Sequence, residues 1–203
     1  MSARRATAPA WLRALALLVL CASASAAQAQ ARLQASDVEA AYLVNFLRYT
    51  QWPELSFATP QSPYVLTVVG AEPVAASVRA VAQAAGVVNG RSIEVRWIAD
   101  AEFQERRDAA RRQQVDDRLR SSHLVFFHAS AGSVRDAELA PLAGQPVLTV
   151  GDQAGFNAAG GMIELVSVAG RIVFQANPAA IRNAGLVVSA KVLKLARAVE
   201  AGT

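Results

Sequence analysis

The segment Tyr64-Val-Leu-Thr-Val-Val-Gly70 decides the fold class of this chain of 203 residues. It is short, mostly apolar and rich in β-branched residues, a composition typical of a strand that is buried on both faces. Gly70 closes it. Such strands occur mainly in parallel sheets that carry helices on either side. The segment therefore predicts an α/β protein.

Helical and strand patterns alternate on both sides of this segment. Upstream, a helix is predicted from Ser36, where Glu39 completes a capping box, to Trp52-Pro53, where proline ends it. Downstream, the patterns predict a helix over 73–85, strands over 92–98, 123–128 and 146–150, and a hairpin of 162–168 with 171–175. Between these strands, residues 100–120 predict one exposed helix or two, with Glu102–Arg106, Asp108–Arg112 and Asp116–Arg120 as ion pairs. A terminal helical segment after Asn177-Pro178 carries Ile181, Val188, Val192, Leu195 and Val199 on one side, with Gly185 as a point where it can break.

These elements predict one domain with a mainly parallel sheet. Helices should cover both faces of the sheet, and the hairpin near the C-terminus should extend it in the antiparallel sense.

The N-terminal residues predict export. Arg4, Arg5 and Arg13 precede an apolar run over 14–22, and small residues with an A-x-A pattern follow. This order is that of a secretory signal peptide, because the apolar run is shorter than the ~20 residues that span a bilayer. We expect residues 1–31 to form the signal peptide, with cleavage near 29–31, and residues 32–203 to form a single periplasmic domain.

Cleavage would change both the thiol content and the charge. Cys21 is the only cysteine, so the mature chain would have no disulfide and no thiolate metal site. The formal net charge of +4 would fall to +1 on loss of the three arginines, which is too little for non-specific binding to phosphate backbones. We therefore expect no nucleic-acid partner.

The side chains that catalysis uses are scarce. His123 and His128 lie five residues apart on one predicted strand and point to opposite faces, so they cannot share a metal ion. No H-E-x-x-H, G-x-S-x-G or glycine-rich phosphate motif is present. We expect no enzyme activity, no metal and no cofactor. The competing hypothesis is a hydrolase whose site forms only in three dimensions, with Asp152 and Glu164 as its carboxylates.

Seven short motifs, in order, resemble the YfiR-like family of periplasmic regulators, over about residues 38–199. The motifs are Ala41–Phe46 through Trp52-Pro53, Val68-Val69-Gly70, Asn89-Gly90-Arg91, Pro146–Val150, Gly155-Phe156 with Gly160–Ile163, Phe174–Asn177, and Ala184–Leu186 with Ser189 and Leu193–Ala196. For the shared residues we expect structural roles in turns and buried faces. They include Trp52, Pro53, Gly70, Asn89, Gly90, Gly155, Gly160, Gly161, Met162, Phe174, Asn177, Gly185, Leu186 and Ser189.

The resemblance implies a non-catalytic function. It implies a protein that binds and represses the periplasmic sensor domain of an inner-membrane diguanylate cyclase, and so lowers cyclic di-GMP and biofilm formation. It also implies a homodimer, and an OmpA-like outer-membrane lipoprotein that draws the repressor away. The family's type member carries cysteines that form disulfides, whereas this mature chain would have none.

The sequence leaves two questions open, namely the partner-contact residues and an alternative function. Candidates for partner contact, chosen by residue type alone, are Tyr49, Trp52, Tyr64 and Trp97. The alternative function is a small-ligand sensor that signals to a histidine kinase or other membrane receptor, with its ligand in the crevice at the carboxyl ends of the strands.

Overall fold

The computed structural model describes residues 35–105, 108–132, 134 and 136–196. The predicted signal peptide and its cleavage site lie outside these residues. Among the described helices, none combines the length and the hydropathy needed to cross a membrane.

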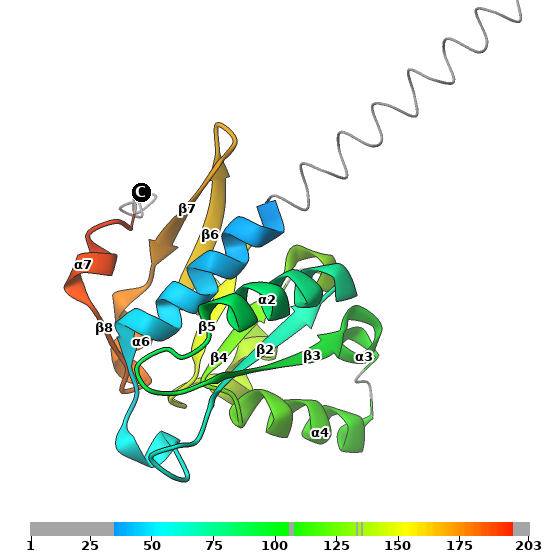
Figure 1. Ribbon diagram of the computed structural model, residues 1–203. Coiled ribbons are helices and arrows are strands. Elements are labelled where there is room, and N and C mark those ends of the chain that lie inside the picture. The colour runs from blue at the N-terminus through cyan, green and yellow to red at the C-terminus, as the bar shows by residue number, and fades with distance from the viewer. Residues whose placement is uncertain (1–34, 106–107, 133, 135, 197–203) are drawn as a thin grey trace, which may run out of the picture. The chain divides into compact units, whose positions relative to one another are not determined.

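A six-stranded sheet forms the centre of the fold, in the order β3-β2-β4-β5-β6-β7 (Figure 1). Its strands are β2 (Tyr64–Gly70), β3 (Ile93–Ala99), β4 (Leu124–Phe127), β5 (Leu148–Gly151), β6 (Ile163–Val168) and β7 (Arg171–Ala176). Neighbouring strands run parallel from β3 to β6, and β7 runs antiparallel to β6. All seven residues of β2 are buried, which confirms the strand predicted from its composition.

Helices cover both faces of this sheet, which confirms the predicted fold class. They are the helix of residues 35–49, which is blue in Figure 1, α2 (Glu72–Ala85), α3 (Asp100–Gln104), α4 (Ala109–Arg120), α5 (Asp136–Leu139), α6 (Pro178–Asn183) and α7 (Ala190–Leu193). Short 3-10 turns lie at η1 (Glu54–Ser56), η2 (Ala129–Ala131) and η3 (Ala140–Leu142).

The side chains of β4 show how the sheet divides two hydrophobic cores. Leu124 and Phe126 point into the core that the helix of residues 35–49, α2 and α6 cover. Val125 and Phe127 point into the core beneath α3, α4 and α5. Because successive side chains of a strand alternate between faces, a strand that is apolar at every position requires both cores.

The glycine-rich loop before β6 is built around one aromatic ring. Phe156 is 1% exposed, and it packs where Gly151 and Gly161 have no side chains. A Cβ on Gly161 would lie 2.2 Å from the Phe156 ring. Glu164 closes the loop, because its carboxylate accepts hydrogen bonds from the amides of Gly155 (3.1 Å) and Asn157 (3.0 Å).

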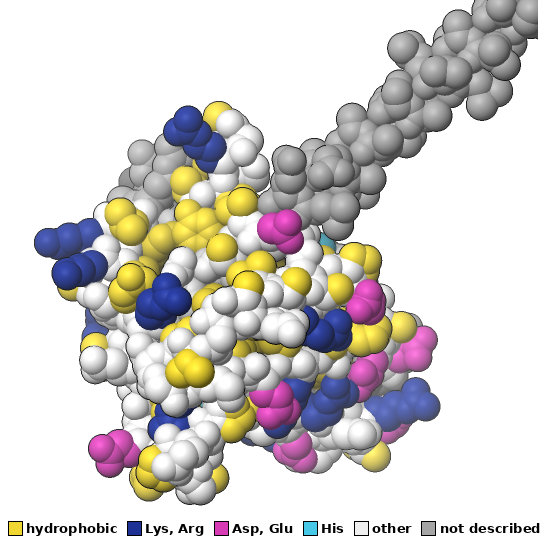
Figure 2. Space-filling model, in the orientation of Figure 1, with side chains coloured by type: hydrophobic (Ala, Val, Ile, Leu, Met, Phe, Trp, Pro, Cys, Tyr) yellow, Lys and Arg dark blue, Asp and Glu magenta, His cyan; other side chains and the backbone are white. Residues whose placement is uncertain are grey.

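The predicted hairpin is confirmed. Ala169 and Gly170 connect β6 to β7 with φ values of 49° and 75°, which is the two-residue turn that matches the twist of a hairpin. The structure also confirms the second of the two forms predicted for residues 100–120, a pair of short helices, α3 and α4. Acidic and basic side chains are interspersed on the surface over these helices (Figure 2).

The predicted ion pairs of this segment are partly wrong. Asp108 pairs with Arg111 rather than Arg112, because Asp108 is the N-cap of α4 and accepts a hydrogen bond from the Arg111 amide. The predicted pair Asp116–Arg120 is confirmed at 4.0 Å, and Arg120 also contacts Asp117 at 2.7 Å. The pair Glu102–Arg106 lies outside the described residues, and Glu102 contacts Arg118.

The predicted break near Gly185 is confirmed, whereas the helical placement of Val188 is wrong. Gly185 has a φ of 68°, which ends α6, and β8 (Val187–Val188) then pairs with β1 (Thr50–Gln51) in a small antiparallel sheet. Val187 and Val188 pair with the extended residues Gln51 and Thr50, which directly follow the first helix. This partner is distant in sequence, so the local helical period could not reveal it. Val199 lies outside the described residues.

We predict that Gly161→Ala destabilises the protein by roughly 1–3 kcal/mol, because the added methyl group overlaps the Phe156 ring and carbonyl. Urea denaturation measures the loss. Gly155→Asn is the control, since Gly155 has a φ of 82° but open space around it, and asparagine tolerates this conformation. Equal unfolding midpoints for Gly161→Ala and wild type would contradict this account of the loop.

Candidate functional site

The carboxyl ends of four neighbouring strands bring polar residues to one edge of the sheet. Gly70 ends β2, and Asp100, His128 and Asp152 directly follow β3, β4 and β5. The chain passes from β2 to β3 on one side and then returns to β4 on the other side of β2. Ligands of open α/β sheets bind where the strand order reverses in this way. The fold therefore favours a binding site at this edge of the sheet.

Three ionisable side chains meet at this edge. Glu39, from the helix of residues 35–49, joins His128 and Asp152, and each offers a ligand atom that lies within 4.8 Å of the other two. His128 Nε2 lies 3.5 Å from Asp152 Oδ2. Among the described residues, these form the one group of three His, Cys, Asp or Glu side chains that is suited to a metal ion. We call Glu39, His128 and Asp152 the strand-end cluster.

Burial and mutual repulsion perturb the two carboxyl groups. Burial, reinforced by the charge of Asp152, raises the pKa of Glu39 from 4.5 to about 7. Burial also raises the pKa of Asp152, while His128 and the backbone amides of Ala129 and Asp152 act in the opposite direction. Asp152 Oδ1 is buried without a hydrogen-bond partner among the described residues. Both carboxyl groups therefore keep their protons to a higher pH than exposed carboxyl groups do.

A chain of hydrogen bonds orients the His128 ring from behind. His128 Nδ1 lies 2.9 Å from Ser130 Oγ, and that hydroxyl donates to Asp100 Oδ1 at 3.1 Å. The Ser130 hydroxyl also accepts a hydrogen bond from the Ala71 amide at 2.8 Å. Both ring tautomers have partners, because Nδ1 can instead accept from the Ser130 amide at 3.1 Å. Loops after three strands therefore fix the position of one imidazole.

Gly70 lets His128 reach this position. A Cβ on Gly70 would lie 2.8 Å from His128 Cβ and 3.3 Å from Ser130 Oγ. Any larger residue at position 70 would displace the histidine. This close approach gives a structural reason for the glycine in the Val68-Val69-Gly70 motif.

His123 has a different environment at the other end of β4. It is 7% exposed and stacks on Phe57 at 4.5 Å between ring centroids, with Trp52 and Tyr64 in edge contact. Its Nδ1 accepts from the Val65 amide at 2.9 Å, so its Nε2 carries the proton toward the Ser56 carbonyl. Burial lowers the pKa of His123, Ser56 raises it, and Arg91 and Arg96 lower it further.

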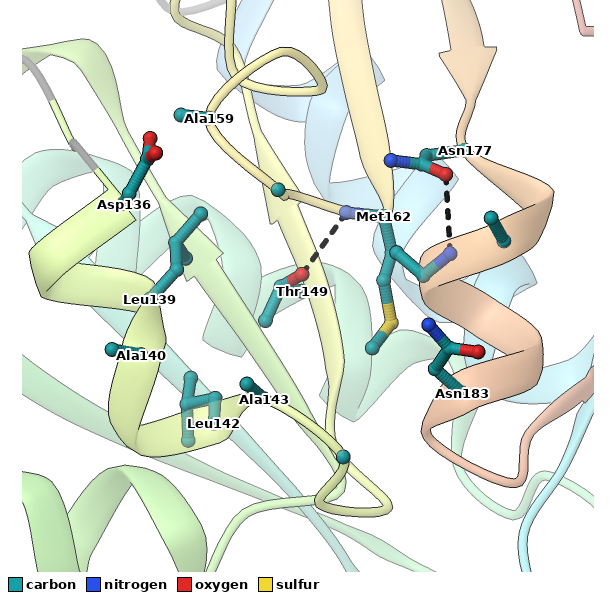
Figure 3. Close-up of a pocket in the computed structure, with 14 residues that line it drawn as sticks. Asp136, Leu139, Ala140, Leu142, Ala143, Thr149, Ala159, Met162, Asn177 and Asn183 are labelled. Atoms are coloured by element: carbon teal, nitrogen blue, oxygen red, sulfur yellow. Dashed lines mark hydrogen bonds between the residues drawn. The ribbon is translucent and has the colours of Figure 1, made fainter.

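A separate apolar cavity lies between η3 and α6 (Figure 3). Its volume is about 350 Å³, and Leu139, Leu142 and Ala143 face Met162 and Asn183 across it. Asn177 caps α6 beside the cavity, since its Oδ1 accepts from the Ala180 amide at 3.1 Å. The cavity is distinct from the strand-end cluster, because no residue of that cluster lines it.

The four aromatic candidates for partner contact lie in different environments. Tyr49 is 42% exposed, whereas Trp52 and Tyr64 belong to the core. Trp97 is partly buried, and its indole donates to the Gly70 carbonyl at 2.8 Å. Only Tyr49 therefore offers a large free surface.

The residues shared with the family motifs occupy turns, caps and the core. Asn89, Gly90, Gly155, Gly160 and Gly185 have positive φ, and Gly185 lies beside Pro53. Trp52 donates to the His123 carbonyl at 3.1 Å, Phe174 packs on Tyr42 and Phe46, and Met162 and Leu186 are buried. Asn177 and Ser189 accept hydrogen bonds at the starts of α6 and α7.

The two carboxylates of the hydrolase hypothesis interact with different partners. Glu164 is engaged by the amides of the glycine-rich loop, while Asp152 belongs to the strand-end cluster. Sequence reasoning assigned Glu39 to a helix cap and so missed its place beside Asp152. The signal available in the sequence was that His128 and Asp152 each directly follow a buried strand.

A family model of YfiR/HmsC-like proteins matches residues 36–197. No curated protein matches the chain. The family is regulatory rather than catalytic. This chain belongs to the YfiR/HmsC-like family, which is periplasmic and known in the regulation of diguanylate cyclase signalling.

We predict that His123 stays neutral to a lower pH than an ordinary histidine, because burial lowers its pKa below 6.5. Its lowered pKa means that only the unfolded chain takes up a proton as the pH falls through 6.5, so the contribution of His123 to stability is complete above 6.5 and declines below it. Imidazole NMR titration of the mature protein measures the midpoint, with His128→Gln to assign the signals. A His123 midpoint at or above 6.5 would refute the prediction.

Proposed function

We propose that this protein is a non-catalytic periplasmic regulator that binds the extracytoplasmic sensor domain of an inner-membrane diguanylate cyclase and represses it. Repression would lower cyclic di-GMP and biofilm formation. The observation that carries the proposal is the family match over residues 36–197, which includes nearly all of the described domain.

The sequence and the chemistry of the fold support this function. An N-terminal segment with the pattern of a signal peptide would deliver the domain to the compartment where such a sensor domain lies. The motif residues serve turns, caps and the core, which fits a scaffold that presents a surface. We further propose that the protein forms a homodimer and that an OmpA-like outer-membrane lipoprotein competes for it.

The corner around the β1–β8 sheet is the surface that we propose for the contact with the cyclase. Tyr49, Leu55 and Val187 are exposed there, at 42%, 99% and 60%. They come from adjoining segments, because Val187 lies opposite Gln51 and the Ser189 amide donates to the Tyr49 carbonyl at 2.8 Å. Exposed aromatic side chains next to apolar ones are enriched at protein–protein contacts.

We predict that Tyr49→Ala weakens binding to the purified cyclase sensor domain by about tenfold or more, as expected for a tyrosine at the centre of a contact. Biolayer interferometry with the mature protein measures this affinity. Val87→Ala is the control, since Val87 is also exposed (66%) but lies in the turn after α2. Equal losses from both variants would exclude this corner.

The function itself is tested by deletion. Loss of the gene should raise cellular cyclic di-GMP, and the mature protein should restore the lower level. Unchanged cyclic di-GMP, together with no detectable complex, would rule out the proposed repression.

A small-ligand sensor is the second candidate, and the cavity between η3 and α6 favours it. Its volume of about 350 Å³ and its mostly apolar lining, with Asn177 and Asn183 as polar groups, are typical of small-molecule sites. In this case the occupied domain would signal to a histidine kinase or another membrane receptor.

We predict that Ala180→Phe, which fills this cavity, abolishes any thermal shift that a periplasmic metabolite causes in the wild type. Differential scanning fluorimetry with a metabolite panel makes the comparison. Ala84→Phe adds the same ring at an exposed position of α2 and should leave the shift intact. A panel without any stabilising compound would count against the sensor.

A further inference from the structure

We propose that the strand-end cluster binds one divalent transition-metal ion. Zn²⁺ is the ion with which we would test this site. Glu39, His128 and Asp152 supply one imidazole nitrogen and two carboxylate oxygens, a donor set that zinc accepts. This inference is independent of the proposed function, because it rests on the chemistry of three side chains.

The geometry is close to that of a coordinated ion. Zinc binds imidazole nitrogen and carboxylate oxygen at about 2.0–2.2 Å, so tetrahedral ligands lie roughly 3.4 Å apart. His128 Nε2 and Asp152 Oδ2 are already 3.5 Å apart. One ligand atom from each of the three residues lies within 4.8 Å of the other two, so closing a tetrahedral site requires a movement of at most roughly 1.4 Å. The rotatable bonds of a glutamate allow that movement without a shift of the helix.

The local charge favours a cation. Two half-buried carboxyl groups face one another. Among the described residues, no lysine or arginine forms an ion pair with the cluster. Asp100 adds a third carboxylate behind His128. A divalent ion would neutralise the pair, and Asp152 Oδ1, which is buried without a hydrogen-bond partner among the described residues, could also bind it.

The hydrogen bonds on the Nδ1 side of His128 resemble those that orient metal-binding histidines. A ligating histidine donates its second N–H to an acceptor, which fixes the ring and the tautomer. Here Nδ1–H would donate to Ser130 Oγ, whose own proton goes to Asp100 Oδ1. Nε2 would then present its lone pair toward Asp152 and Glu39. Three protein ligands leave a tetrahedral ion one position for water or for a group from a partner.

Metal binding would link two parts of the fold. Glu39 belongs to the helix of residues 35–49, whereas His128 and Asp152 belong to loops at the strand ends. An ion held by all three would fasten the start of this helix to the edge of the sheet. The metal-bound protein should therefore melt at a higher temperature than the metal-free protein.

Isothermal titration of tag-free, EDTA-treated mature protein with ZnCl₂ is the test. We expect saturable binding of one ion per chain, and visible d–d absorption when Co²⁺ replaces Zn²⁺. His128→Ala, Glu39→Gln and Asp152→Asn should each weaken binding by roughly 100-fold or more, and Ser130→Ala by about 10- to 100-fold. Asp37→Asn, an exposed carboxylate on the same helix as Glu39, should leave binding unchanged.

The variants also separate loss of a ligand from loss of the fold. Removing one of two facing carboxylate charges relieves repulsion, so metal-free Glu39→Gln and Asp152→Asn should melt no lower than wild type. Failure to bind Zn²⁺ or Co²⁺ with one-to-one stoichiometry would overturn the proposal. Binding that survives all three ligand substitutions would overturn it as well, since the ion would then lie elsewhere.

Discussion

The burial of β2 and β4 on both faces is the constraint on which the rest of the structure depends. An apolar strand in the middle of a sheet must have a hydrophobic layer above it and another below it. The helix of residues 35–49 and α2 supply one layer, and α3, α4 and α5 supply the other. Because α2, which follows β2, and α5, which follows β4, lie on opposite faces, the loops after these two strands diverge. The edge of the sheet therefore becomes a place where polar side chains can meet.

The same constraint explains why this edge is electrostatically unusual. His128 and Asp152 come immediately after buried strands, so their backbones are held rigidly by the sheet ladder. Glu39 reaches them from a helix that packs on the sheet through Leu43, Phe46 and Leu47. Apolar packing thus places charged groups close together and removes them partly from water. Burial of this kind raises the pKa of carboxyl groups and makes an added cation favourable.

Three features of this domain, made of different residues, suit different tasks. The strand-end cluster has the donors of an ion site, the cavity between η3 and α6 has the lining of a small-molecule site, and the β1–β8 corner exposes apolar side chains. A regulator needs inputs and an output, and separate locations allow them to act without steric competition. The glycine-rich loop, held by Phe156 and Glu164, lies beside both the cavity and Asp152 and joins the two regions through a rigid segment.

Local patterns in the sequence predict the fold class, the hairpin and the start of α6, since each depends on residues that are close together in the chain. The apolar run of β2, the Ala169-Gly170 turn and the Asn177-Pro178 cap each act over a few residues. Tertiary structure alone decided what distant segments do to one another. The valines of β8 became a strand because β1 offered an extended partner, and Trp52 and Tyr64 became core around His123. Glu39 lies 89 residues from His128 and 113 from Asp152, so no local period could place them together; the packing of a helix on a sheet did so.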